Sequence, residues 1–491
     1  MPSVAQAVLR SWSIPPVATF ALVLTALTYL RGAWLLRRAG YPYLPAWRIA
    51  SFALGLFALW LALASPLDTF SPFVLTAHMV QHMVLMMVAP PLILLGEPLI
   101  PIVRGMPRFA AREFAGPILN WRIAERMGLA LTNPVFALVL MGIVMFAWHV
   151  PGPYELAVRS STWHQLEHAC FCFTSIIFWW PVVQPWPSRA PWPRWAMVPY
   201  LVIADLENTA LSAILVFSDK ILYPSYAAGP GLFGFNPPED QAAAGAIMWV
   251  VGSLVFIVPA ILIAIECLSR RRAEVQVSLS TPPKGSVEAA SSHPRAKKQF
   301  ANRLNSRALE AASFVTLFLL TAAVFIVLSS HASDDDDQVL RLSQQEGPFA
   351  ISVYGPAGEL VTGSEDFAVL VQDRSSRAVL LDSEVRFILR DTAGKDLPMT
   401  IAASPGDENK LLFAANLDLD TPGPWRLDIT VQNANRNGIV SMPLEVVTAT
   451  ESGFRLRWSY VVIGAVSVLL CSAYFWRHRT SKPAGLVAPV A

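Results

Sequence analysis

The sequence predicts an all-α polytopic membrane bundle, with about seven core helices and two more, joined to an extracytoplasmic β-sandwich. Three observations predict this fold class. The chain of 491 residues is 54% hydrophobic and only 15% charged, which is too apolar for an ordinary soluble protein. Its apolar residues come in runs of roughly 20, the length of helix that crosses a hydrocarbon core. A stretch near the C-terminus instead alternates apolar and polar residues with a period of two, which is typical of strands.

Nine apolar runs are long enough to be membrane spans. They cover residues 17–36, 48–65, 73–95, 134–150, 164–184, 195–217, 243–268, 308–329 and 458–476. The first seven follow one another closely and predict a membrane domain over residues 1–268. Residues 269–307 are rich in Ser, Pro, Lys and Arg and predict a cytoplasmic linker before the eighth span.

The charges of the loops predict the orientation. Loops after the first, third, fifth and seventh spans are basic, as at Arg37 and Arg38 and at residues 270–272. The alternate loops are acidic or nearly neutral, as at the DDDD of residues 334–337. Basic loops stay in the cytoplasm. We therefore expect the N-terminus and the segment 346–448 outside the membrane, and the C-terminus in the cytoplasm.

The segment 346–448 predicts a small β-sandwich of roughly seven short strands. Alternating stretches such as VRFILRD and WRLDITVQ are separated by turn residues such as PAG and TPGP. The segment has no His and no Cys, so we expect a docking role for it and no metal site. The four cysteines of the chain lie in or beside apolar runs and indicate no disulfide framework. A net charge of +2 without a basic tract indicates no nucleic-acid partner.

Five histidines predict a metal or cofactor site. His78 and His82 lie in the run HMVQHM, His164 and His168 in HQLEH, and His149 ends the fourth span. Residues four apart share one face of a helix. At about 1.5 Å of rise per residue, the expected topology puts all five within roughly 15 Å of the outer face. Imidazole is a good ligand for Cu, Zn, Fe and Ni.

Soft ligands accompany these histidines. Thioether and thiolate groups select Cu(I), and in a helix with no metal the same side chains simply fill the apolar core. Four such residues lie within four positions of a histidine: Met79, Met83, Met145 and Cys172. The combination favours a path for a soft metal over a single hydrolytic site.

The sixth span carries the polar residues Asp205 and Asn208. An acid in the middle of a membrane helix costs about 3 kcal/mol on insertion scales, so it faces the interior of the bundle. Three roles stay open for this pair: orienting a histidine ring as a hydrogen-bond acceptor, relaying protons, or pairing with a structural donor.

Two alternatives use the same histidines. The run HQLEH fits H-x-x-E-H, the spacing of inverted zinc peptidases, in which Glu167 would be the general base; Glu167 could equally be an interfacial acid near the outer surface. A zinc membrane peptidase is therefore one alternative. A redox protein with a haem held by histidines from two helices is the other.

Several long runs resemble one family. TAHMVQHMVLMMVAPPLILLGEP, MFAWHVPGPYELAVRSSTWHQLEH, FWWPVV and DQAAAGAIMWVVGS look like the polytopic CtaG-type assembly factors of cytochrome c oxidase, over about residues 40–270. The resemblance implies a bacterial plasma-membrane protein that is not an enzyme and that helps to mature a haem–copper oxidase. Copper is the cargo it suggests, and the matching positions are the five histidines.

The same resemblance implies the partners. These are cytochrome c oxidase subunits and membrane lipid, with a periplasmic copper chaperone as a further candidate. The C-terminal segment 346–448 departs from the core family and is similar to the small extracytoplasmic domains of the FixH or YtkA kind.

Overall fold

The computed structural model describes most of the chain in ten stretches. They are residues 3–40, 44–107, 128, 130–186, 192–227, 231–232, 236–280, 338–356, 358–391 and 398–448. The expected spans 308–329 and 458–476, and the expected linker beyond residue 280, lie outside these residues and stay predictions.

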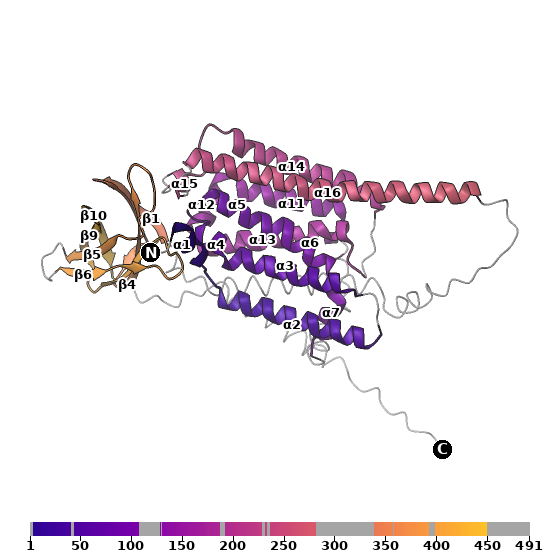
Figure 1. The fold of residues 1–491 in the computed structure, drawn as a ribbon, viewed down its shortest axis with the longest axis horizontal. Helices are drawn as coiled ribbons and strands as arrows, with labels where there is room; N and C mark the ends of the chain where they lie inside the picture. The colour runs from indigo at the N-terminus through magenta and orange to yellow at the C-terminus, as the bar shows by residue number, and fades with distance from the viewer. Residues whose placement is uncertain are drawn as a thin grey trace, which may run out of the picture. The chain divides into compact units, whose positions relative to one another are not determined.

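Membrane helices make up the N-terminal part. Six helices of the described residues are long and apolar enough to cross a membrane, or seven if one bent pair counts as a single span. In Figure 1 they run side by side as a bundle. The predicted multi-pass helical bundle is therefore confirmed. The main helices are α2 (Pro16–Arg38), α3 (Ala46–Ala64), α4 (Pro66–Phe70), α5 (Leu75–Met83), α6 (Ala89–Leu95), α7 (Leu99–Gly105), α11 (Pro134–His149), α12 (Pro151–Arg159), α13 (Ser161–Val183), α14 (Met197–Phe217), α15 (Pro224–Ala227) and α16 (Pro237–Ser280), after the short α1 (Val4–Arg10).

Proline bends the span formed by α11 and α12. Asn133 caps the start of α11 by accepting hydrogen bonds from the N–H groups of Val135 and Phe136. The residue before a proline avoids helical angles, and Val150, before Pro151, is extended. The two helices meet at 71°. The bend lets α12 fold back against α13.

A second proline aligns two helices that matter for the site. The turn Val84–Val88 between α5 and α6 is π-helical, a form common at functional sites. Pro90 has no N–H, so it cannot bond the carbonyl four residues earlier, that of Met86. Two side chains of α13 take its place: Ser175 Oγ donates to the Met86 carbonyl, and Trp179 Nε1 donates to it at 3.1 Å. These bonds hold α13 beside the α5–α6 segment.

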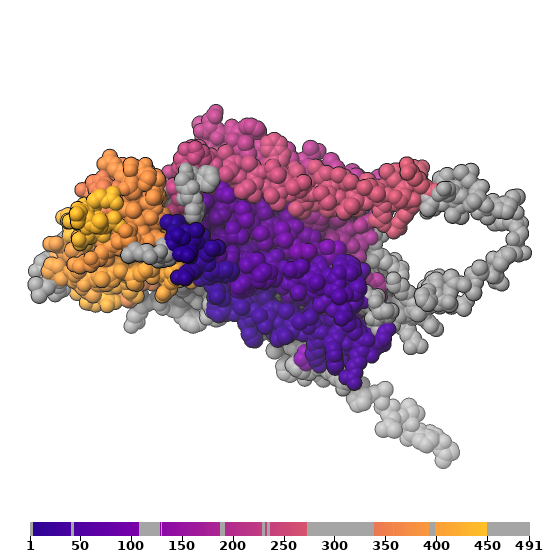
Figure 2. Space-filling view, viewed as in Figure 1, coloured from indigo at the N-terminus to yellow at the C-terminus, as the bar shows by residue number. Residues whose placement is uncertain are grey.

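The helices α14 and α16 pack along each other at one edge of the bundle, where Figure 2 shows them in pink. Asn236 and Glu239 cap the start of α16 reciprocally, with bonds of 2.9 and 3.1 Å. Gly252 of α16 leaves room for Asn208 of α14, because an added Cβ there would collide with the Asn208 amide.

The C-terminal part is a β-sandwich of two five-stranded sheets, which confirms the predicted fold class. The first sheet has the order β1-β2-β4-β8-β7 and the second β3-β10-β9-β5-β6. The strands are β1 (Gln338–Glu346), β2 (Phe349–Pro356), β3 (Leu360–Val361), β4 (Gly363–Asp373), β5 (Glu384–Asp391), β6 (Met399–Ala402), β7 (Ser404–Pro405), β8 (Phe413–Leu419), β9 (Gly423–Asn433) and β10 (Arg436–Val447). Alternate residues of β5, such as Val385, Phe387 and Leu389, are buried between the sheets.

The strand count differs from the expected seven. Two of the ten, β3 and β7, have two residues each, too few for an alternating pattern to reveal them. The strand β1 begins at Gln338, before the expected start at residue 346.

Candidate metal centre

Four side chains from two helices converge inside the bundle. His78 and His82 come from α5, and His164 and Glu167 from α13. One ligand atom from each lies within 4.8 Å of every other. Spacings of four residues on α5 and three on α13 put each pair on one helix face, and the bonds to the Met86 carbonyl hold the two helices side by side.

The rings and the carboxylate are in direct contact. The His78 and His164 rings stack with centroids 5.2 Å apart, and the His78 and His82 centroids are 4.2 Å apart. Glu167 Oε2 lies 3.8 Å from Nε2 of His78 and 3.8 Å from Nε2 of His82. This distance is too long for a hydrogen bond.

The cluster is buried and its polar atoms have no hydrogen-bond partners. Glu167 is 0% exposed, His78 1% and His82 3%; His164 is partly exposed. The unpaired buried atoms are His78 Nε2, both ring nitrogens of His82, His164 Nε2 and both carboxylate oxygens of Glu167. A buried polar group without a partner costs about 1–3 kcal/mol, and buried polar groups in proteins are nearly always paired.

A metal ion fits this donor set. Nitrogen and carboxylate ligands lie about 2.0–2.2 Å from Zn²⁺, so two ligands of one such ion can be at most about 4.2–4.4 Å apart. The 3.8 Å separations between Glu167 and the two histidines satisfy this limit. The largest separation in the set, up to 4.8 Å, exceeds this limit by about 0.4–0.6 Å, so these donors must move closer together to share one ion.

The two remaining histidines flank this set. His168 is 4% exposed, and its ring centroid lies 4.1 Å from that of His164 and 5.3 Å from that of His82. His149 Nδ1 is 2.7 Å from the Met145 carbonyl, which assigns the ring proton to Nδ1 and leaves Nε2 as a lone pair. Nε2 of both flanking histidines is buried without a partner. They are available to a second ion or to a relay, but they lie outside the group of four.

Of the expected soft ligands, the Cys172 thiol does not join this group. Met79, Met83, Met145 and Cys172 are all buried, and the Cys172 thiol is not among the clustered donors of the described residues. Met79 and Met83 each follow a histidine by one residue, about 100° around the helix, and Met79 also lies three residues before His82. Packing in the apolar core accounts for their burial.

Asp205 and Asn208 lie elsewhere, on α14. Asn208 is buried and its amide donates to the Met248 carbonyl of α16 at 3.1 Å. Asp205 is half-buried, and its Oδ1 has no hydrogen-bond partner. Asn208 therefore joins two helices, and neither residue belongs to the four-residue cluster.

Glu167 was the one member of the cluster that the sequence did not place in it. An interfacial position near the outer surface was one expectation; the structure shows only that the residue is 0% exposed and so does not face solvent. Its i+3 relation to His164 was the available signal. The position of α13 against α5 was not visible in the sequence.

Tyrosines cover one side of the cluster. The Tyr154 ring of α12 lies 5.1 Å from the His78 ring and stacks on Tyr223 at 3.8 Å. Tyr223 donates to the His149 carbonyl at 3.0 Å, and Tyr226 to the Ser71 carbonyl at 2.7 Å. Burial raises the pKa of Tyr223 and of Tyr226, so both hydroxyls stay protonated and act as donors.

The tyrosine-bearing segments are tied together by Glu155. Its two carboxylate oxygens accept from the N–H of Ser225 at 3.0 Å and from the Ser225 hydroxyl at 2.5 Å. Arg159 forms an ion pair with the same carboxylate. We call α12 and α15, so joined, the tyrosine cover.

Two further side chains position α5. Asp240, at the start of α16, accepts hydrogen bonds from the N–H groups of Leu75 and Thr76 at 2.7 and 3.0 Å. These N–H groups belong to the first turn of α5 and have no partner within the helix. Gln81 donates to the Ala62 carbonyl at 2.8 Å and to Asp68 Oδ1 at 2.7 Å. Hydrogen bonds therefore hold α5 in place on both sides of His78, at Leu75 and Thr76 before it and at Gln81 after it.

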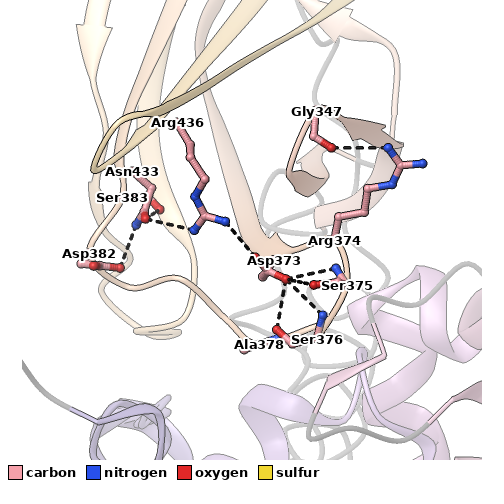
Figure 3. Close-up of polar contacts among 10 residues, drawn as sticks. All are labelled: Gly347, Asp373, Arg374, Ser375, Ser376, Ala378, Asp382, Ser383, Asn433 and Arg436. Carbon is pink, nitrogen blue, oxygen red and sulfur yellow. Dashed lines mark hydrogen bonds and ion pairs between the residues drawn. The ribbon is translucent and has the colours of Figure 1, made fainter.

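In the sandwich, Asp373 and Asn433 are hydrogen-bonded to neighbouring groups. Asp373 accepts from the hydroxyl of Ser375 at 2.7 Å, from the N–H of Ser376 at 3.1 Å and from Arg436 at 2.9 Å (Figure 3). Hydrogen bonds from Ser375, Ser376 and Arg436 hold the pKa of Asp373 well below its usual range. Nearby, the Asn433 amide donates to Asp382 at 2.8 Å and to Ser383 at 3.2 Å. These groups satisfy one another and leave no donor set open.

Comparison with known proteins identifies the family of the helical bundle. Residues 27–270 match the model of the family described as "Cytochrome c oxidase caa3 assembly factor (Caa3_CtaG)". The membrane part of the chain belongs to this family. All five histidines of the bundle lie within the matched residues, and the sandwich lies outside them. The family implies a cytochrome c oxidase assembly factor and suggests a non-catalytic role.

Mycobacterial proteins are among the curated relatives. The chain is 28% identical over 188 residues to the uncharacterized protein Mb0105 of Mycobacterium bovis and, equally, to MT0111 of Mycobacterium tuberculosis; the match covers 37% of this chain and 28% of each relative. It is 25% identical over 175 residues to ML1998 of Mycobacterium leprae, covering 35% of this chain and 26% of the relative. The chain thus spans about a quarter of the length of these relatives. No solved structure matches the chain.

Proposed function

We propose that this chain is a bacterial plasma-membrane assembly factor that holds copper in the His78–His82–His164–Glu167 cluster and delivers it to a nascent haem–copper oxidase. One observation supports the proposal: four donor groups, three of them buried, converge within 4.8 Å and have buried donor atoms without hydrogen-bond partners among the described residues. Copper is the ion for which imidazole-rich sites have the highest affinity in the divalent series. The family, described as assembly factors of cytochrome c oxidase, suggests that the partner is this oxidase.

The site lies where delivery to an outer-side centre would need it. Basic loops assign the ends of α2, α14 and α16 near Arg37, Arg194 and Arg270 to the cytoplasm. His78 is in the first turn of α5 and His164 in the first turn of α13, and both helices start from the opposite side. The sandwich would lie on that side as well, where it would dock the oxidase or a periplasmic copper chaperone.

Haem is less compatible with this geometry than copper. Two axial histidines need a flat macrocycle between them, whereas the His78, His82 and His164 rings pack directly on one another and on Tyr154 and Phe171. A zinc peptidase needs Glu167 as a base beside the metal. In the copper proposal Glu167 has no base function. It belongs to the cluster that holds the ion, so its replacement would affect metal binding itself.

The test is oxidase maturation at low copper. A strain lacking the protein is complemented with the wild type, with His78→Ala/His82→Ala, or with His293→Ala, a control in the expected linker. We expect the double variant to accumulate in the membrane, while oxidase activity and the copper content of the oxidase fall to the level of the uncomplemented strain. The control should restore both. Normal activity and copper content in the double variant would overturn the proposal.

A further inference from the structure

We propose that the cluster binds its ion in the divalent state, with Glu167 as a direct ligand beside His78, His82 and His164. This inference rests on the proposed function and specifies the chemical class of its cargo. It departs from the soft-metal path that the sequence favoured, in which thioether and thiolate groups accompany the histidines and would select a cuprous ion.

The donor atoms themselves point to a divalent ion. Three imidazole nitrogens and one carboxylate make a set of borderline and hard donors, which suits divalent copper or zinc. A cuprous ion prefers thioether and thiolate ligands and would leave the carboxylate without a role. Glu167 would then remain wholly buried with both oxygens unpaired, which is unfavourable.

The position of Glu167 also favours direct ligation. Its Oε2 lies 3.8 Å from the Nε2 atoms of both His78 and His82. A carboxylate that oriented a ring from outside the site would instead accept a hydrogen bond from it at about 2.7–3.2 Å. An equal separation from two nitrogens, beyond hydrogen-bond range, is the arrangement of ligands around a common centre.

Charge balance supports the same assignment. The carboxylate supplies one negative charge, whereas neutral imidazoles supply none. A buried divalent ion is stabilised by such a paired charge, since isolated ions are strongly disfavoured away from water. A site built for soft neutral ligands would gain nothing from an acid at its centre.

The test compares copper in its two oxidation states on the full-length chain in detergent. Cu(II) is titrated against a competing chelator and followed by electron paramagnetic resonance, and Cu(I) is titrated anaerobically against a cuprous chelator. The variants are Glu167→Gln, Met83→Leu and Cys172→Ser. Glu207→Gln is the matched control, because Glu207 is a half-buried acid on α14 that lies against Gly142.

We expect one Cu(II) per chain, with a spectrum that shows nitrogen coordination. Loss of a ligand should weaken binding at least as much as loss of a group that orients a ligand, so Glu167→Gln should lower Cu(II) affinity by roughly 10- to 100-fold or more. It should also change the spectrum. Met83→Leu, Cys172→Ser and Glu207→Gln should leave both unchanged.

Each other outcome overturns a separate claim. Tight Cu(I) binding that survives Glu167→Gln but is lost in Met83→Leu or Cys172→Ser would overturn the divalent assignment and leave the copper-delivery proposal standing. Cu(II) binding as expected, with normal oxidase maturation in the His78→Ala/His82→Ala strain, would overturn the delivery proposal and leave the divalent site standing. Binding of neither ion by the folded protein would overturn both.

Discussion

The four-residue cluster of the bundle and the Asp373 network of the sandwich differ in how their polar groups are satisfied. In the bundle, His78, His82 and Glu167 lie in contact, almost fully buried, without hydrogen-bond partners. In the sandwich, Asp373 and Asn433 make at least two hydrogen bonds each to neighbouring side chains or backbone. Polar groups that satisfy one another contribute to stability, whereas a set left unsatisfied is tolerated where a ligand completes it. The contrast separates a site from a scaffold.

The largest expected effect comes from making the cluster apolar. In Glu167→Leu/His82→Leu the bundle should lose metal binding, yet unfold at the same or a higher temperature when metal is absent, because each unpaired buried polar group costs about 1–3 kcal/mol. In the sandwich, Asn433→Leu should lower stability by about 1–3 kcal/mol, because partners that remain buried lose their bonds.

Thermal unfolding of the full chain in detergent measures both, and hydrogen-exchange mass spectrometry assigns each transition to bundle or sandwich peptides. Equal destabilisation by the two changes would mean that the cluster is structural. Adding copper sharpens the contrast further: at a concentration 100-fold above the dissociation constant it should stabilise the wild-type bundle by about 2.7 kcal/mol, and a chelator should reverse this. The sandwich peptides should not respond.

Local residue spacing in the sequence predicted the histidine pair of α5 and the buried face of β5. The four-residue spacing of His78 and His82 put them on one helix face, and the alternation in β5 indicated a strand buried on one side. The pairing of α5 with α13 was not visible, because it depends on the Met86 carbonyl that Pro90 leaves free and on donors 89 and 93 residues away. Without that pairing, Glu167 could not be placed beside His78.

In the sandwich, too, contacts between residues distant in sequence could not be predicted. The parallel pairing of β3 with β10 joins Leu360 to Val446. It involves only two residues of β3, which is too short for a periodic pattern to predict a strand. For the same reason the Asp240 anchor was missed: its partners on α5 are 165 and 164 residues away, and an acid at a helix start is usually explained by its own helix.

The next effect in size concerns that anchor. Asp240→Ala removes the acceptor for two N–H groups in the first turn of α5, three and two residues before His78. Loss of a helix cap costs about 1 kcal/mol, so we expect a several-fold loss of copper affinity and faster hydrogen exchange in residues 75–83. Glu239→Ala is the control. This neighbour of Asp240 is exposed, and within the part of the chain that the structure describes its hydrogen bonds go to Asn236. An unchanged affinity in Asp240→Ala would show that the first turn of α5 does not position the site.

A smaller, kinetic effect is expected from the tyrosine cover. Glu155→Gln weakens the bonds to Ser225 that join α12 to α15, so the cover over His78 should open more often. Stopped-flow loading with copper should become several-fold faster, while the stoichiometry stays the same. In Arg159→Gln only the exposed ion pair is lost, and loading should keep the wild-type rate. Slower loading in Glu155→Gln would mean that the cover guides the ion in, and does not obstruct it.

The smallest effect belongs to the sandwich and depends on pH. Hydrogen bonds from Ser375, Ser376 and Arg436 hold the pKa of Asp373 below that of an unfolded aspartate, which is about 3.9. Its ionised form therefore stabilises the sandwich fully above the unfolded pKa, and this contribution is lost as the pH falls toward the folded pKa. Asp373→Asn should lower the unfolding temperature of the sandwich at pH 7, and the difference from the wild type should shrink between about pH 5 and 3. Asp420→Asn, at an exposed position after β8, is the control, since it leaves the hydrogen bonds to Asp373 in place. Copper should leave the Asp373 effect unchanged, because the Asp373 network is closed upon itself and the donor cluster found among the described residues lies in the bundle.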